Sequence, residues 1–271
     1  MSELTKFLFE GLPVRGMLVR LTDSWQELLA RREKANDAFP APVRTLLGEM
    51  AAAGALMQSN IKFNGALVLQ VFGDGPVRLA VVEVQPDLAY RATAKVVGAV
   101  DASAQLEAMV NLHGKGRCAI TLDPKDKRPG QQPYQGVVPL HGDKREPLQQ
   151  LSQVLEHYML QSEQLDTRLV LAADDRIAAG LLIQRLPIEG AGNLAGQRNE
   201  DRIGLDEAEA HLARMLSKYP PNDDQIGFVE DAHDFRPGIP THSHAGGGMH
   251  VSYRGNGRDA NGRAAPILVR R

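Results

Sequence analysis

The chain has 271 residues, of which 43% are hydrophobic and 24% are charged, and its formal net charge is -2. These proportions are typical of soluble globular proteins, and the length suits one large domain or a domain with an appendage. A nearly neutral chain has no field that would gather nucleic acid or anionic membrane, and no apolar run reaches the roughly 20 residues that span a bilayer. We therefore expect neither nucleic acid nor membrane as a partner.

A single cysteine, Cys118, excludes an intrachain disulfide and a cysteine-cluster metal site. The first residues, Met1 to Leu4, lack the basic and apolar segments of a signal peptide. Both features favour a cytoplasmic location in the reducing cytosol. Because Cys118 lies in a strand-like run that ends at Leu122, we expect a buried and inert thiol.

Two helices are predicted in the first sixty residues, among short apolar runs that also have helical spacing. Trp25, Leu28 and Leu29 recur at helical intervals behind the candidate cap Thr22. A second helix follows Pro42 and is rich in small residues, which allow close approach to a sheet. Its apolar face consists of Val43, Leu46, Leu47, Met50, Gly54 and Met57.

A block of strands follows, beginning with a hairpin. Residues 67–72 and 77–82 are β-rich runs joined by the turn Gly73-Asp74-Gly75-Pro76. Another helix is predicted near residues 148–163. Further strands are predicted at 90–97, 118–122, 134–140, 167–172 and 177–185. Because the strands form a block, the pattern predicts an α+β fold with a mixed β-sheet core and packed helices.

The composition changes after Arg185. We predict a core domain over residues 1–186 and a linker over 187–218, with a short amphipathic helix at 206–218. Residues 219–271 are rich in Gly, Arg, His and Asn and show no helical or strand period. Such a segment cannot bury enough apolar surface to offset its ordering entropy, so we predict a disordered tail.

Glycine-rich segments raise the question of nucleotide binding. Gly190 to Ala195 matches the dinucleotide fingerprint, but Pro187 interrupts the approach and a polar stretch follows, which favours a linker. Gly73-Asp74-Gly75-Pro76 fits a hairpin turn better than a phosphate loop. Gly114-Lys115-Gly116 lacks the Ser or Thr of a P-loop.

Histidines and acids give no stronger indication of a catalytic or metal site. Three histidines of the tail, His242, His244 and His250, could gather a soft divalent ion, but without an ordered scaffold such binding would be weak. The pair Asp174-Asp175 fits a solvated turn between strands. The remaining candidates, which share no face or scaffold, are His233, Glu156, Glu163 and Asp166. The sequence thus predicts no catalytic, cofactor-binding or metal-binding residue, and no enzyme.

A set of short motifs resembles one known family. The motifs are Leu8-Phe9-Glu10, Val14-Arg15-Gly16, Pro42-Val43, Ile61-Lys62-Phe63, Gly73-Asp74-Gly75-Pro76, Tyr134-Gln135-Gly136-Val137-Val138 and the run from Tyr158 to Leu165. In this order they resemble the redox-regulated bacterial heat-shock chaperone family, the thirty-three-kilodalton chaperonin, over about residues 4–216. Each motif is short, but their joint occurrence is specific.

The resemblance implies an ATP-independent holdase that binds unfolded client proteins and forms a homodimer. In that family a C-terminal zinc domain with four cysteines acts as a redox switch, because oxidation removes the thiolate ligands and unfolds the domain. This sequence contains only Cys118, so the family's zinc is not expected and no ligand is carried over.

Two hypotheses account for the departure, which begins at about Ser217. Either the tail is an out-of-frame translation, as its bias to Gly, Arg, Ala and His suggests, or the chain comes from a lineage that lost the switch.

Client binding needs exposed apolar surface. The small-residue helix after Pro42 and residues 205–216 are candidates, and ordinary packing is the alternative for both. Besides an active holdase, an inactive core acting as an interaction module remains open, and so does a nucleotide-binding oxidoreductase that uses Gly190 to Ala195.

Overall fold

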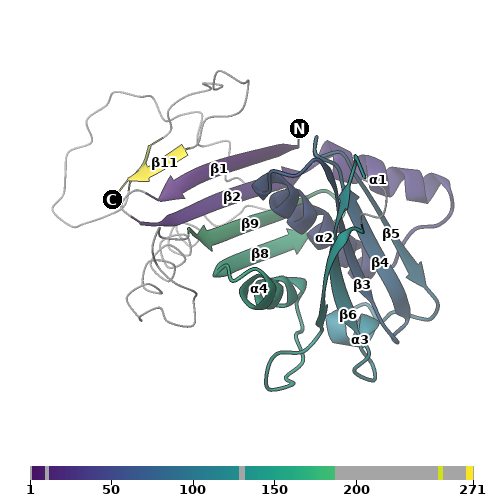
Figure 1. The fold of residues 1–271 in the computed structure, drawn as a ribbon. Helices are drawn as coiled ribbons and strands as arrows, with labels where there is room; N and C mark the ends of the chain where they lie inside the picture. The colour runs from purple at the N-terminus through teal and green to yellow at the C-terminus, as the bar shows by residue number, and fades with distance from the viewer. Residues whose placement is uncertain (1, 10–11, 128–131, 187–249, 253–266, 271) are drawn as a thin grey trace. The chain divides into compact units, whose positions relative to one another are not determined.

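The computed structural model describes residues 2–9, 12–127, 132–186, 250–252 and 267–270 (Figure 1). The helices are α1 (Asp23–Lys34), α2 (Ala41–Asn60), α3 (Leu106–Val110) and α4 (Leu151–Ser162). The strands are β1 (Glu3–Phe9), β2 (Val14–Leu21), β3 (Gly65–Phe72), β4 (Val77–Val84), β5 (Tyr90–Val96), β6 (Arg117–Pro124), β7 (Tyr134–Pro139), β8 (Thr167–Ala173), β9 (Ala178–Arg185), β10 (His250–Ser252) and β11 (Ile267–Arg270). The predicted α+β class is confirmed.

The chain divides into two compact units. The first comprises residues 1–4 and 18–182, and the second comprises residues 5–17 and 183–271. The first unit holds the four helices and a five-stranded antiparallel sheet with the order β5-β4-β3-β6-β7. A six-stranded sheet has the order β10-β11-β1-β2-β9-β8.

The β3–β4 hairpin forms where the sequence predicts it. The amide of Gly73 donates to the carbonyl oxygen of Arg78 at 3.2 Å and closes the turn. A methyl group added at Gly75 would come 2.2 Å from the carbonyl oxygen of Met109, so only glycine fits there. The turn therefore packs its backbone directly on α3.

Helix α2 forms the centre of the first unit and is buried on nearly every side (Figure 1). On one side a methyl group added at Gly54 would come 2.8 Å from a methyl carbon of Val84 in β4. On the other side a methyl group added at Gly48 would come 2.4 Å from the β-carbon of Ala173 in β8. Small residues therefore let one helix pack closely on both β4 and β8, whereas the sequence predicted a single apolar face.

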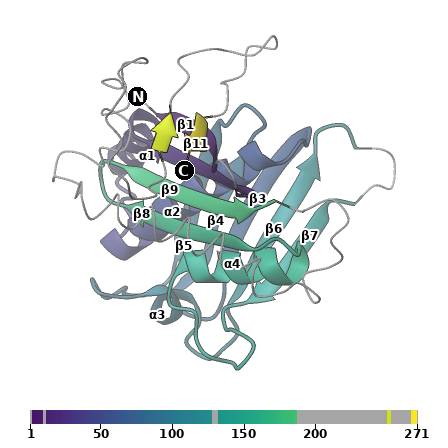
Figure 2. The same ribbon diagram turned by 90° about the vertical axis from the view of Figure 1, so that its left-hand side faces the viewer.

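Helix α1 begins after Thr22, as predicted, although the threonine side chain does not cap it. The indole of Trp25 is fully buried, and its Nε1 donates to the carbonyl oxygen of Asp174 at 2.7 Å. This bond ties α1 to the turn between β8 and β9. Helix α4 packs on β8 and on β7 (Figure 2).

Three features differ from the sequence-based predictions or lie beyond them. Strands β1 and β2 and the short helix α3 were not predicted, because short apolar runs fit helix and strand periods equally well. In the predicted tail, β11 pairs in parallel with β1, and β10 pairs with β11. The edge of β1 offers backbone partners to β11, and β11 in turn pairs with β10. The predicted linker helix at 206–218 lies outside the described residues.

Candidate functional site

One face of the five-stranded sheet carries a group of partly exposed apolar side chains. Along β3 and β4 the buried residues alternate with half-buried ones, so the two sets point to opposite faces. The inner set packs on α2. We define the outer patch as the apolar members of the other set that are larger than alanine, together with a residue of β7 that is 50% exposed. The outer patch consists of Val68, Phe72, Leu79, Val81 and Val137.

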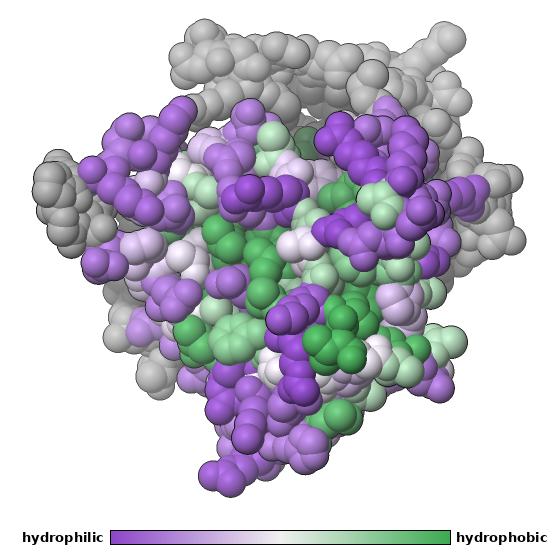
Figure 3. Space-filling view, turned by 90° about the vertical axis from the view of Figure 1, so that its right-hand side faces the viewer, coloured by the Kyte–Doolittle hydropathy of each residue, from purple (hydrophilic) through white to green (hydrophobic). Residues whose placement is uncertain are grey.

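The strand register makes the outer patch nearly continuous. Phe72 lies directly opposite Leu79, and Val81 lies opposite Gln70. On the other side of β3, Gln70 lies opposite Ala119, which in turn lies opposite Val137. Residues opposite each other on one face are about 5 Å apart, so these residues are neighbours on the outer face. Val68 lies between Glu83 and Thr121. Figure 3 shows several groups of apolar residues over the centre of this face of the molecule, with polar residues between and around them.

The apolar character of both faces is unusual for an antiparallel sheet. Such a sheet typically has one apolar face on the core and one polar face in water. Here Val68 and Phe72 lie on the outer side of a strand whose inner side carries Leu69 and Val71, both fully buried. An exposed apolar area with polar surroundings indicates a surface for protein interaction.

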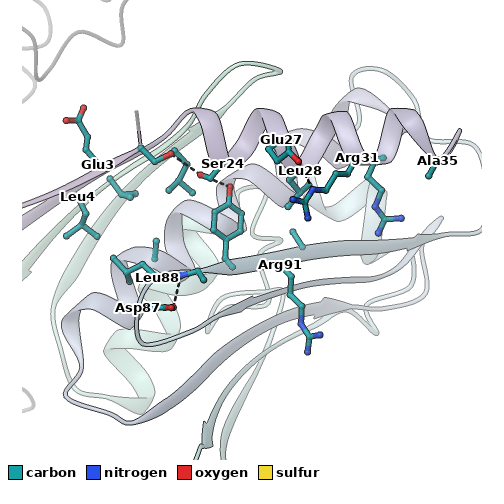
Figure 4. A pocket seen from close by; sticks show the side chains of 18 residues that line it. Glu3, Leu4, Ser24, Glu27, Leu28, Arg31, Ala35, Asp87, Leu88 and Arg91 are labelled. Atoms are coloured by element: carbon teal, nitrogen blue, oxygen red, sulfur yellow. Dashed lines mark hydrogen bonds and ion pairs between the residues drawn. The ribbon is translucent and has the colours of Figure 1, made fainter.

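A groove of about 880 Å³ lies between α1 and the β4–β5 hairpin, within the first unit (Figure 4). Its lining includes apolar side chains from several elements, among them Leu4, Val19, Leu21, Leu28 and Leu88. The hydroxyl of Tyr90 donates to Ser24 Oγ at 3.3 Å across the groove. At the α1 side, Arg31 Nε donates to Glu27 Oε1 at 2.7 Å.

The chemistry of the groove favours apolar contact over catalysis. Burial raises the pKa of Tyr90, so its phenol stays protonated and donates to Ser24. The hydrogen bond from Arg31 lowers the pKa of Glu27, so this carboxylate stays charged and paired. Because the acid and the phenol are both far from neutral titration, neither is suited to acid–base catalysis at pH 7.

Cys118 lies on β6 and is fully buried. Burial raises the pKa of its thiol to about 12. Reactivity requires the thiolate, so the prediction of a buried and inert thiol is confirmed.

The acidic residues that the sequence singled out form hydrogen bonds or ion pairs within the fold. Asp174 is in the β8–β9 turn, as predicted, and its Oδ1 accepts the amides of Arg176 and Ile177, each at 2.7 Å. Asp175 pairs with Arg44 at 2.6 Å, so it is not simply solvated. Glu156 accepts the amide of Leu169 at 2.7 Å.

Near the end of α4, Glu163 accepts hydrogen bonds from the hydroxyls of Tyr158 at 2.6 Å and Tyr134 at 3.2 Å. Asp166 lies 3.6 Å from Arg168 Nη1. The structure therefore does not bring these acids together in one site.

Several sequence candidates lie outside the described residues, namely Gly190 to Ala195, His233, His242 and His244, while His250 begins β10. Within the part of the chain that is described, no three His, Cys, Asp or Glu side chains cluster closely enough to hold a metal ion. The helices among those residues are all too short or too polar to cross a bilayer.

Comparison with known proteins decides the family. The family model described as "Hsp33 protein" matches residues 2–225. The chain belongs to the Hsp33 family. It is 48% identical over 204 residues to the 33 kDa chaperonin of Chromobacterium violaceum, covering 75% of this chain and 63% of the relative. It is 45% identical to that of Methylobacillus flagellatus, covering 69% of this chain and 58% of the relative.

The chain thus spans about three fifths of the length of these Hsp33 relatives. The 33 kDa chaperonin of Neisseria meningitidis serogroup A is 39% identical, with 80% of this chain and 70% of the relative covered. The crystal structure of the Thermotoga maritima 33 kDa chaperonin matches with a TM-score of 0.58 at 17% identity, over 80% of this chain and 70% of that one. The latter likeness supports the fold.

Of the two stretches that the sequence offered as possible client surfaces, one is packed, as the ordinary-packing interpretation expects. The small-residue helix after Pro42 is α2, and its side chains are packed in the core, which leaves it no free apolar face. Residues 205–216 lie outside the described part. The outer patch was missed, although the nearly unbroken apolar run from Leu67 to Phe72 was a signal, since a one-sided strand would alternate with polar residues.

Proposed function

We propose that this chain is an ATP-independent holdase that binds non-native proteins through the outer patch. The observation that carries the proposal is the group of half-buried apolar side chains on the outer face of the sheet, including Val68, Phe72 and Val81. The names of the Hsp33 relatives support a chaperone. Unfolding clients expose apolar segments, and contact with such a face removes apolar area from water on both partners.

The family's redox switch does not fit this sequence. Its only cysteine is Cys118, and burial in β6 keeps that thiol protonated. Four thiolate ligands for zinc cannot come from it. We therefore infer that client binding by this chain does not depend on oxidation. We also infer a cytoplasmic location and the homodimer that the family resemblance implies, which sedimentation at several concentrations tests.

Light scattering of a heat-denaturing client, without nucleotide, tests the proposal. We expect this chain to suppress aggregation equally under reducing conditions and after peroxide treatment. Suppression only after peroxide would contradict the absence of a switch. No suppression in either condition would overturn the active holdase and leave a folded core that acts as an interaction module.

Substitutions on the sheet locate the surface. The double variant Val68→Thr with Val81→Thr keeps side-chain shape and β-propensity but reduces apolar area, so suppression should fall several-fold. Gln70→Val, between these two positions, should increase it. Opposite effects at unchanged melting temperature identify the outer patch, whereas equal suppression by all variants would exclude it.

A further inference from the structure

One end of the outer patch lies between positively charged side chains. The strand register places Lys95 opposite Leu79, Leu79 opposite Phe72, and Phe72 opposite Arg117. The four residues therefore form one row across β5, β4, β3 and β6, with two apolar side chains between two cations. Arg78, at the β-bulge beside Leu79, is exposed and adds a third cation.

These cations keep their charge available to a partner. Arg117 donates to the carbonyl oxygens of Gly114 at 3.3 Å and Gly116 at 2.7 Å, which orient the guanidinium without neutralising it. Lys95 and Arg78 are exposed, and no described carboxylate forms an ion pair with either of them. Asp74 in the adjacent turn is held by His113, at 3.3 Å from Nδ1.

The opposite end of the patch is electrostatically different. On the same face, two rows away from the row of Leu79 and Phe72, Arg91 lies opposite Glu83. The two side chains form an ion pair of 2.5 Å. Beyond that row, Asp123 on β6 pairs with Lys127 at 2.6 Å. These two pairs cancel locally, and Lys125 is an exposed cation there, so the end beside the β3–β4 turn carries the stronger positive field.

From this asymmetry we propose that the outer patch prefers apolar client segments that carry Asp or Glu on one flank, with the acidic flank beside Lys95, Arg78 and Arg117. The inference rests on the proposed function and names the class of client segment. Leu79 and Phe72 hold the apolar part, and the flanking cations attract the acidic part. Each exposed pair adds a modest and salt-sensitive gain, so two or three pairs give a preference of about fivefold at low salt.

Three labelled peptides test the preference by fluorescence anisotropy. They share one apolar core of Val, Leu and Phe, flanked on one side by two Asp, two Ser or two Lys residues. The full chain should bind the Asp peptide about fivefold more tightly than the Ser peptide, and the Lys peptide most weakly. The difference should shrink in 0.5 M salt, since screening weakens exposed charge pairs.

Two double variants show whether the preference depends on where the cations lie or only on the net charge of the protein. Lys95→Gln with Arg78→Gln removes two of the three cations, so it should reduce the preference strongly and leave binding of the Ser peptide unchanged. Lys125→Gln with Lys127→Gln removes the same charge at the other end of the sheet and should retain the preference.

Equal affinity for the three peptides, or a preference that the first double variant leaves undiminished, would overturn the inference while client binding stands. Failure to bind any of the three would instead overturn the proposed function.

Discussion

At the scale of single residues, the environment changes what a side chain does. Cys118 has the thiol group that a redox sensor needs, but burial in β6 raises its pKa to about 12, so the thiol does not form the reactive thiolate.

Leu88 has an ordinary side chain but an unusual backbone, with a φ of 67° in the β4–β5 hairpin. Its side chain lines the groove beside α1. The hairpin therefore tolerates strain at a position that glycine would normally occupy.

The left-handed backbone at Leu88 predicts a reversal of the usual order of stability between alanine and glycine. Leu88→Ala and Leu88→Gly both remove the side chain, but only glycine relieves a strain of roughly 1 kcal/mol. We expect Leu88→Gly to be the more stable of the two in urea unfolding. If the alanine variant is more stable, as at ordinary positions, the backbone at this residue is not strained.

A second residue predicts a pH dependence of stability. Glu49 on α2 is partly buried, and this burial raises its pKa from 4.5 to about 7. Below pH 4.5 the carboxyl is protonated in both the folded and the unfolded chain, so it has no effect. Between these two pKa values the unfolded chain ionises first, and stability is lost as the pH rises.

Replacing Glu49 with Gln tests this dependence. The variant should match the parent in free energy of unfolding at pH 4.5 and exceed it by roughly 2 kcal/mol at pH 8. Urea unfolding at both pH values measures the difference. A constant difference between the two proteins would contradict the raised pKa.

At the scale of elements, the small residues of α2 allow it to pack closely on neighbouring strands. Its two glycines give no intrinsic advantage in a surface helix, since glycine weakens helices by about 1 kcal/mol. Between β4 and β8, however, the absence of side chains at Gly48 and Gly54 lets the backbones approach. The same feature explains why α2 has no free apolar face for clients.

This packing predicts that Gly48→Ala destabilises the protein although alanine favours helices. The added methyl would lie 2.4 Å from the β-carbon of Ala173 and 3.1 Å from the indole of Trp25, neither of which can move aside. We expect a loss of roughly 2 kcal/mol in urea unfolding. Gly98→Ala, whose added methyl would lie 3.4 Å from Pro76, is the control and should change stability little. Equal effects at both positions would refute close packing at Gly48.

At the scale of the whole molecule, the match to the family model ends at residue 225, close to where the sequence loses its resemblance. A core with the family's fold therefore continues into a segment of different character. A shift of reading frame and a lineage that lost the zinc domain both produce this pattern.

The coding DNA distinguishes the two histories. If the tail is out of frame, another frame downstream of about codon 217 should encode Cys-x-Cys followed by Cys-x-x-Cys, the thiolates of the family's zinc site. Sequencing the gene and translating all frames checks this. Without those codons in any frame, the loss of the switch is a property of the lineage.

The sequence by itself determined the class of the fold, most of its elements and the family. The turn Gly73-Asp74-Gly75-Pro76, the helix behind Thr22 and the small-residue helix after Pro42 are local patterns, and local sterics and periodicity suffice to predict them. Tertiary structure decided which apolar surfaces are free. The burial of α2, the outer position of Val68 and Phe72, and the row from Lys95 to Arg117 depend on pairing between residues distant in sequence. Such pairing is a property of the packed sheet, because a side chain's neighbours there come from other strands.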